Sequence, residues 1–316
     1  IPGLLGPLLG PSLGGWLVEV ASWHWIFLIN VPVGLVGLLA SLRFMPHLRA
    51  DSPPPLDMPG YLLLALGMVA LSLGLESLGQ RWQLGLAWCA VGAASLALYL
   101  AHARRCQAPL FGPHLWRIAS LRIGLWGNLL SRLGSTSMPF LVPLLLQVGL
   151  GYSPLQAGLW LLPMVAAGMA VKTLAVPLVR RWGYRRVLVG NTLALGLGMV
   201  SFVWLTAEQP LAWRLLQLAW FGAANSLQFS AMNTVTLQEL DGSTASSGNS
   251  LLSMVQMLAL GMGVALAGGL LAAFAGGHTE GAQVLPAFQA TFLCMGLLTM
   301  AASAIFARLP HSPQAG

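Results

Sequence analysis

The stretch IPGLLGPLLGPSLGGWLVEV (residues 1–20) decides the fold, because its run Gly6–Gly15 places four glycines and two prolines in an otherwise apolar segment. Such a segment is about as long as a bilayer is thick, and a helix in lipid tolerates these residues since neighbouring helices satisfy the freed backbone groups. Gly6, Gly10 and Gly14 recur every four residues, which predicts a smooth face for close helix packing. The alternative, a glycine–proline loop of a soluble protein, is disfavoured by the apolar flanks.

The composition of the chain is that of a protein in lipid. Hydrophobic residues make up 57% and charged residues 7% of the 316 residues, and the mean hydropathy is +0.77, whereas about 25% of a globular domain is charged. The net charge of +7 does not indicate a nucleic-acid partner, because the basic residues fall in short runs between apolar segments rather than on one accessible face. The expected partner is therefore the lipid bilayer.

Cysteine and histidine usage gives no sign of a metal centre. The cysteines Cys89, Cys106 and Cys294 are unpaired in spacing and lie mostly within apolar runs, and the six histidines are scattered. This pattern indicates neither a disulfide framework nor a zinc site, so we expect no metal and no cofactor. The chain opens at Ile1 without a basic region before its apolar run, which we interpret as missing N-terminal sequence rather than a signal peptide.

Ten mostly apolar segments are candidate membrane spans. They cover residues 1–20, 24–43, 60–77, 84–101, 121–147, 155–179, 187–206, 211–230, 249–273 and 286–307. Eleven arginines follow the second, fourth, sixth and tenth spans, and two lie on the other side: Arg43, Arg49, Arg104, Arg105, Arg117, Arg122, Arg180, Arg181, Arg185, Arg186 and Arg308, against Arg81 and Arg214. By the positive-inside rule the first group and the C-terminus are predicted to face the cytoplasm.

Two polar connections divide the spans into groups. Residues 44–59 contain Pro53–Pro55 and are predicted to form a stiff loop, and residues 102–120 form a second linker. Four further spans before residue 1 would complete two matching halves of six with an inserted pair between them. The predicted organisation is 1–43, the last two helices of an N-terminal half; 44–59, a cytoplasmic loop; 60–101, the inserted helix pair; 102–120, a cytoplasmic linker; 121–307, the C-terminal six-helix half; and 308–316, a cytoplasmic tail.

Two adjacent motifs resemble one family of transporters. The first is a glycine, three residues, Gly-Pro, two residues and Gly-Gly, and the second is SWHWIFLINVPVG directly after it, at residues 22–34. In this order they are similar to the fifth span and the start of the sixth in the major facilitator superfamily, among the fourteen-span drug:proton antiporters of the EmrB/QacA type. The antiporter motif falls on Gly6, Gly10, Pro11, Gly14 and Gly15. The resemblance implies an all-α polytopic membrane protein of the major facilitator fold, with about ten of an expected fourteen transmembrane helices.

The resemblance also implies a mechanism. It implies a multi-pass protein of the bacterial inner membrane that works as a monomer and exports small amphipathic substrates by alternating access, driven by the proton gradient and without a cofactor. A glycine–proline hinge would let the two halves close on the outer side, so we expect Gly14→Leu to abolish resistance. The family's proton-coupling acid lies on spans that this sequence does not contain, so we do not expect this chain alone to transport.

The connection RRWGYRR (residues 180–186) is similar to the Asp-Arg-x-Gly-Arg-Lys/Arg gating loop of the superfamily. Arg180 stands where the family has an acid that would clamp a helix N-terminus or a basic partner, so this copy departs from the gating pattern. The resemblance assigns the remaining gating positions to Arg181, Gly183, Arg185 and Arg186.

Two cations within the predicted spans are the strongest candidates for a binding site. Arg132 lies about 15 Å beyond Arg122, and Lys172 about 12 Å before Arg180, at 1.5 Å per residue. A charge at such a depth costs at least about 2.5 kcal/mol and usually faces a cavity or a partner. No acid in these spans falls at a matching depth, so the countercharge would come from other helices, an anionic ligand or loss of the lysine proton. The alternative is that either side chain snorkels to the interface.

Polar residues at helical spacing indicate a cavity beside these cations. Asn128 shares a helix face with Arg132, and further polar positions follow on the eighth and ninth spans. The same stripes occur where helices hydrogen-bond to one another, at about 0.6 kcal/mol per contact, and that interpretation stays open. The candidate substrate or proton pathway consists of Arg132, Lys172, Asn128, Asn225, Gln228 and Gln256.

These features favour a proton-coupled multidrug efflux antiporter. An organic-anion or metabolite exporter of the same fold is the alternative, and the two buried cations favour it. A membrane enzyme is disfavoured because the sequence shows no cluster of His, Asp or Cys at the interface. An ATP-driven pump is disfavoured because the sequence lacks a GxxxxGK[S/T] loop. A scaffold role also stays open.

Overall fold

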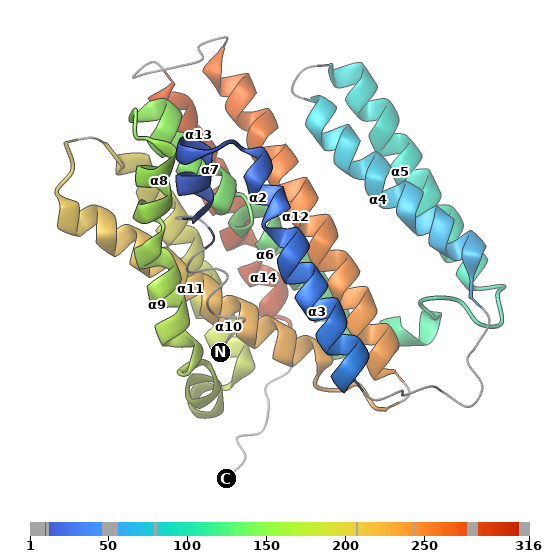
Figure 1. The fold of residues 1–316 in the computed structure, drawn as a ribbon. Helices are drawn as coiled ribbons and strands as arrows, with labels where there is room; N and C mark the ends of the chain where they lie inside the picture. The colour runs from blue at the N-terminus through green and yellow to red at the C-terminus, as the bar shows by residue number, and fades with distance from the viewer. Residues whose placement is uncertain are drawn as a thin grey trace.

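The computed structural model describes residues 10, 13–45, 56–78, 81–206, 208–242, 244–276 and 284–309, and within these ranges it contains helices and no strand. Figure 1 shows long helices packed side by side. A chain in lipid must satisfy every backbone group internally, and a helix does so within its own segment. The all-α fold predicted from the sequence is therefore confirmed.

The first part of the chain begins with a helix at residues 13–20, which is followed by four further α-helices and one 3-10 helix. They are α2 (His24–Leu28), α3 (Asn30–Phe44), α4 (Met58–Leu78), α5 (Trp82–Ala103) and the 3-10 helix η1 (Pro113–Arg117). The second part is a bundle formed by α6 (Ala119–Ser135), α7 (Met138–Leu144), the π-helical turn η2 (Leu145–Gly149), α8 (Pro154–Trp160), α9 (Leu162–Lys172), α10 (Ala175–Ser201), the 3-10 turn η3 (Phe202–Trp204), α11 (Leu211–Leu237), α12 (Ala245–Ala275), α13 (Leu285–Ala301) and α14 (Ser303–Phe306).

Within the described ranges eight helical segments are long and apolar enough to span a membrane, whereas the sequence predicted ten spans. The first predicted span, residues 1–20, lies largely outside the described residues. The span predicted at residues 211–230 is present as the continuous helix α11, but polar residues keep it out of the apolar set. The eight apolar segments and α11 therefore account for nine of the ten predicted spans, all except the first.

α11 keeps its polar side chains inside the bundle by bonding them to α10. Gln217 Nε2 donates to Ser201 O at 2.7 Å, and Gln228 Nε2 donates to Thr192 Oγ1 at 2.6 Å. Asn191 Nδ2 donates to Gln228 Oε1 at 2.8 Å. These amides lower the mean hydropathy of α11. They can still be buried among apolar helices, because each has a hydrogen-bond partner on a neighbouring helix.

α4 and α5 form a pair that packs against α12 and stands at one side of the bundle (Figure 1). Glycines allow the two backbones to approach: a Cβ on Gly74 would lie 3.1 Å from Gly85 O, and a Cβ on Gly85 would lie 2.9 Å from Gly74 O. Lipid tails are as apolar as leucine, so such close contact replaces the hydrophobic effect as the force that joins helices.

Asp57 starts α4 and ties it to α5. Its Oδ1 accepts a hydrogen bond from Gly60 N at 2.9 Å and lies 2.8 Å from His102 Nε2. Burial raises the pKa of the Asp57 carboxyl, but the bonds from Gly60 N, His102 and Leu110 N together lower it more, so the pKa falls below its usual value. The carboxylate is therefore charged at neutral pH, which is the form that a helix N-terminus stabilises.

The core of the bundle combines stacked aromatic rings with close backbones. The rings of Phe202 and Phe292 stack with centroids 5.4 Å apart. A Cβ on Gly196 of α10 would lie 2.8 Å from Gly296 O of α13. The backbones of α10 and α13 are therefore in close contact at these glycines.

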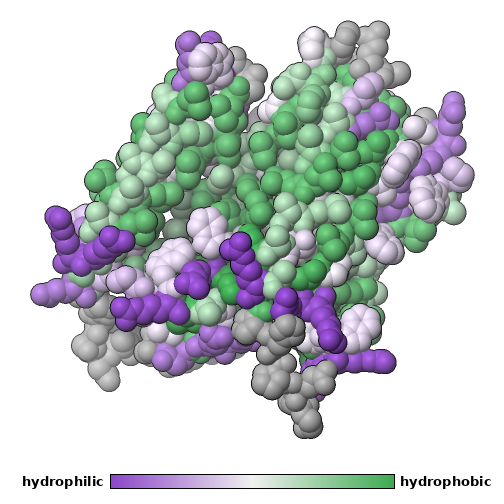
Figure 2. All heavy atoms as spheres, turned by 180° about the vertical axis from the view of Figure 1, so that it is seen from behind, coloured by the Kyte–Doolittle hydropathy of each residue, from purple (hydrophilic) through white to green (hydrophobic). Residues whose placement is uncertain are grey.

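The polar surface gathers at one end of the molecule. Figure 2 shows most hydrophilic side chains along the lower end and apolar side chains over the flanks. The C-terminal ends of α3 and α5 and the turn between α9 and α10 point toward the lower side of Figure 1, opposite the side where α4 ends and α5 begins. We call this side the basic end, because it carries Arg43, Arg104, Arg105, Arg117, Arg122, Arg180, Arg181, Arg185 and Arg186.

The close packing of α9 on α11 predicts the outcome of a matched pair of substitutions. A Cβ at Gly222 would overlap the backbone carbonyl of Met164, whereas no described atom lies within 4 Å of a Cβ placed at Gly268. We expect Gly222→Ala to lower the free energy of unfolding by about 1–3 kcal/mol, because the overpacked helices must shift. Gly268→Ala should change it by no more than about 1 kcal/mol. Thermal unfolding in detergent measures both, and equal midpoints would contradict the α9–α11 contact.

Candidate functional site

The predicted fifth span continues past Arg132 with a local irregularity. α6 ends at Ser135 and α7 begins at Met138, and Thr136 and Ser137 between them keep right-handed helical dihedral angles. Arg132 O accepts from both Thr136 N, at 2.9 Å, and Thr136 Oγ1, at 2.6 Å, and Gly134 O accepts from Ser137 N at 3.2 Å and Ser137 Oγ at 2.5 Å, so side-chain bonds add to the backbone bonds at the end of α6.

Arg132 itself is held on one side and unsatisfied on the other. Its Nε donates to Asn128 Oδ1 at 3.2 Å, and its guanidinium carbon lies 4.6 Å from the ring centroid of Phe229. One terminal nitrogen, NH2, is buried without a hydrogen-bond partner, and no carboxylate in the described part of the chain pairs with this arginine. A buried cation with a free donor is costly, and an anionic group would satisfy it.

A cavity of about 300 Å³ lies between α9 and α11, next to Phe229. Its wall combines apolar and sulfur-containing side chains with a few polar groups, and we call it the α9–α11 cavity. Lys172 and Asn225 both line it, and both are exposed. Phe229 joins the cavity to Arg132, since the same ring that lines it lies under the guanidinium. The lining includes Met164, Met169, Lys172, Asn225, Ser226 and Phe229.

The other predicted pathway residues bond within the bundle. Asn128 is fully buried, and its Nδ2 donates to Gly124 O of its own helix at 3.0 Å and to Thr236 Oγ1 of α11 at 3.3 Å, while its Oδ1 accepts from Arg132. Gln228 bonds to α10, as described above, and Gln256 Nε2 of α12 donates to Asn233 Oδ1 of α11 at 2.8 Å. Of the six predicted pathway residues, the structure therefore brings Lys172 and Asn225 into the cavity, with Arg132 and Asn128 beside it.

The glycine motif contacts α8 through one residue that the sequence did not single out for packing. A Cβ on Gly15 would lie 2.5 Å from Pro154 O, whereas no described atom lies within 4 Å of a Cβ at Gly10 or Gly14. Gly6 and Pro11 lie outside the described residues. Gly15 is rotated by about 100° from Gly14 around the helix axis. The helix face that approaches α8 therefore differs by that rotation from the predicted face of Gly6, Gly10 and Gly14.

Glu19 lies one turn after Gly15 and extends the same contact. Its Oε1 accepts a hydrogen bond from Leu155 N at 3.0 Å, at the first turn of α8. The side chain of Ser153 caps the same helix by accepting from Gln156 N at 3.3 Å. A carboxylate at a helix N-terminus is stabilised by the free N–H groups there, so Glu19 fastens the helix of residues 13–20 to α8.

The predicted gating connection is a sharp turn inside α10. Gly183 has φ 75° and ψ 156°, a conformation that is essentially restricted to glycine. Arg181 and Arg186 are exposed and Arg185 is half-buried. A side chain at Gly183 would strain the turn, so the glycine explains how two membrane helices reverse direction across a few residues at the basic end.

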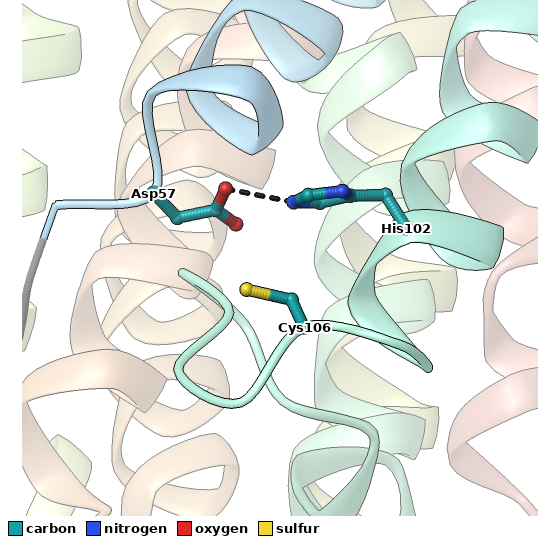
Figure 3. Close-up of side chains that lie close together, drawn as sticks. All are labelled: Asp57, His102 and Cys106. Carbon is teal, nitrogen blue, oxygen red and sulfur yellow. Dashed lines mark hydrogen bonds and ion pairs between the residues drawn. The ribbon is translucent and has the colours of Figure 1, made fainter.

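One cluster was missed by the sequence analysis. Asp57, His102 and Cys106 lie together at the basic end, with one ligand atom of each within 4.8 Å of the others (Figure 3). The expectation of no His, Asp or Cys cluster at the interface is therefore wrong. Asp57 is 45 residues from His102 along the chain, so motif spacing could not find the group; the only local signal was the spacing of four between His102 and Cys106.

Comparisons with known proteins agree with this architecture. The sequence profile described as "Major Facilitator Superfamily" matches residues 2–264. Curated relatives named "Putative multidrug resistance protein MdtD", from Salmonella paratyphi A and Salmonella typhimurium, are each 46% identical to this chain over 323 aligned residues, which cover 99% of this chain and 68% of the relative. Family match, close relatives and apolar helices together show that the chain is a multi-pass membrane protein that belongs to the major facilitator superfamily.

Proposed function

We propose that this chain forms part of a proton-coupled multidrug efflux antiporter of the bacterial inner membrane. The antiporter works as a monomer by alternating access. Membership of the superfamily supports transport. Relatives named for multidrug resistance, at 46% identity, support export of drug-like molecules. In this proposal the basic end and the C-terminus face the cytoplasm, because arginines accumulate on the cytoplasmic side of membrane proteins.

The observation that carries the proposal is the α9–α11 cavity with Arg132 beside it. Its wall is mainly apolar, with two methionines and an aromatic ring, and it offers a small number of polar groups at Lys172 and Asn225. Flexible methionines adapt to ligands of different shape, and a few convergent polar groups fix their orientation. Such a cavity suits small amphipathic substrates.

Alternating access assigns roles to the two ends of the molecule. Helices from residues 1–43 belong to an N-terminal half and those from 121–307 to a C-terminal half, joined by the loop 44–59, the inserted pair 60–101 and the linker 102–120, with 308–316 as a tail. The Gly15–Pro154 and Glu19–Leu155 contacts are then where the halves close on the outer side. The turn at Gly183, with Arg181, Arg185 and Arg186, lies at the inner side.

Proton coupling predicts the response of efflux to a protonophore. In an efflux-deficient bacterial host that expresses the natural gene, cells should accumulate less of a fluorescent amphipathic dye than cells with an empty vector. A protonophore should abolish the difference, because the proton gradient drives antiport. Dye accumulation measured with and without protonophore tests this, and a difference that survives the protonophore would contradict proton coupling.

An organic-anion or metabolite exporter of the same fold is the second candidate, and the unpartnered nitrogen of Arg132 favours it. Arg132→Ala should raise the KM for an anionic dye by roughly tenfold to a hundredfold, since a hydrogen bond to a charged group is worth about 1.5–3 kcal/mol. Efflux of a cationic dye should change much less. Arg81→Ala, an arginine at the opposite end of the molecule, is the control. Equal losses for both dyes would exclude anion selectivity at Arg132.

The outer contact predicts different effects of two neighbouring glycines. Gly15→Leu should strongly reduce efflux while the protein still reaches the membrane, because the side chain would separate residues 13–20 from α8. Gly14→Leu should have the smaller effect, in contrast to the expectation from the motif alone, because no described atom lies within 4 Å of a Cβ there. Efflux normalised to the membrane-inserted protein measures both, and a greater loss in Gly14→Leu would reject the contact at Gly15.

A further inference from the structure

We propose that Asp57, His102 and Cys106 form a Zn²⁺ site at the basic end of the α4–α5 pair. The carboxylate, imidazole and thiol converge from three places: the start of α4, the last turn of α5 and the loop that follows it (Figure 3). One ligand atom of each lies within 4.8 Å of the others. The site shares no residue with the α9–α11 cavity, and it is independent of what the protein transports.

The backbone holds all three donors in place. Asp57 is fixed by the bond from Gly60 N to its Oδ1 at 2.9 Å. Cys106 N donates to His102 O at 2.9 Å, so the helical path continues for one more turn and places Cys106 on the same face as His102. The i, i+4 spacing is the one by which a helix presents two ligands to a single metal ion.

The loop after Cys106 is also fastened to α5. The hydroxyl of Tyr99 accepts from Phe111 N at 2.8 Å and lies 3.3 Å from Phe111 O, and Leu110 N lies 3.4 Å from Asp57 Oδ2. These bonds keep the thiol close to the carboxylate without a metal. Little chain entropy would then be lost on binding, and partners around the ligands raise metal affinity.

The donor set selects the metal. Thiolate, imidazole and carboxylate together suit Zn²⁺, whereas Mg²⁺ and Ca²⁺ prefer oxygen ligands alone. A carboxylate and a thiolate supply two negative charges, which match a divalent cation. On binding, the Cys106 thiol releases its proton to solvent and becomes the thiolate ligand, and the direct contact between His102 and Asp57 is replaced by a bond from each side chain to the ion.

The positions of the three side chains allow Zn²⁺ to replace the direct contact between His102 and Asp57. Around Zn²⁺ the donor atoms would stand roughly 3.5 Å apart, so the His102–Asp57 pair, now at 2.8 Å, opens slightly and the thiol moves inward. The Asp57 side chain is 2% exposed and the His102 side chain 29% exposed, so the carboxylate is shielded while the imidazole leaves a path for the ion. A water would fill the fourth position.

A bound ion would join α4, α5 and the linker to η1 at a single point. The helix pair is otherwise attached to the bundle mainly through α12. Zn²⁺ would therefore fix the base of the pair relative to the linker that leads into α6.

Cobalt(II) is the probe, because it takes the ligands of zinc and its complexes with thiolate absorb light through sulfur-to-metal charge transfer. The protein is purified in detergent without a histidine tag and titrated with Co²⁺. We expect one equivalent to bind with a charge-transfer band that Zn²⁺ removes. No such band in the parent protein would overturn the proposal.

Matched variants identify the ligands. Cys106→Ser should abolish the charge-transfer band, while Cys89→Ser and Cys294→Ser should keep it. His102→Gln should weaken binding by at least about tenfold, and His114→Gln, in η1, should not. A band that persists in Cys106→Ser, or vanishes equally in Cys294→Ser, would place the metal elsewhere.

Asp57→Asn separates metal binding from folding. The asparagine oxygen can still accept from Gly60 N, so the cap of α4 is retained. We expect weaker Co²⁺ binding, with the metal-free protein still folded and its thermal midpoint lowered only modestly, because the neutral amide weakens the contacts with His102 and Leu110 N. Binding as tight as in the parent would remove Asp57 from the site.

Discussion

A helix in a bilayer has no water to bond to, and the rest of this structure depends on that constraint. The backbone is satisfied within each helix, but lipid gives no hydrophobic force that would draw one helix to another. The helices are held instead by close backbones and by paired polar groups. Gly74 and Gly85 join α4 to α5, Gly196 and Gly296 join α10 to α13, and Gln228 bonds α11 to α10.

Arg132 is an exception to this pairing of polar groups. Its neighbours provide one hydrogen bond from Nε and one aromatic face, and one nitrogen stays buried without a partner. The amides of Gln217, Gln228 and Gln256 each bond to a neighbouring helix, whereas this arginine keeps a buried charged donor without an acceptor in the described part of the chain. It lies beside the α9–α11 cavity, to which it is joined by the ring of Phe229.

The two proposed sites follow different rules. The α9–α11 cavity lies among membrane helices and combines adaptable apolar side chains with a few polar groups. The Asp57–His102–Cys106 cluster lies at the basic end, outside the apolar core, where charged ligands are cheaper to hold. The first concerns what the protein moves, and the second concerns how the α4–α5 pair is fastened to the linker before α6.

The sequence by itself determined the all-α membrane fold, since apolar runs of bilayer length leave the backbone no other solution, and it identified Arg132 and Lys172 because charges are rare in such runs. It also placed the turn at Gly183. Tertiary structure alone decided that Gly15 rather than Gly14 meets α8, because the two differ only by rotation about one helix axis. It alone separated Asn225, in the cavity, from Gln228, which bonds to α10. It alone brought Asp57 to His102 and Cys106, because the distance between side chains far apart in the chain depends on how the helices pack and not on their spacing in the sequence.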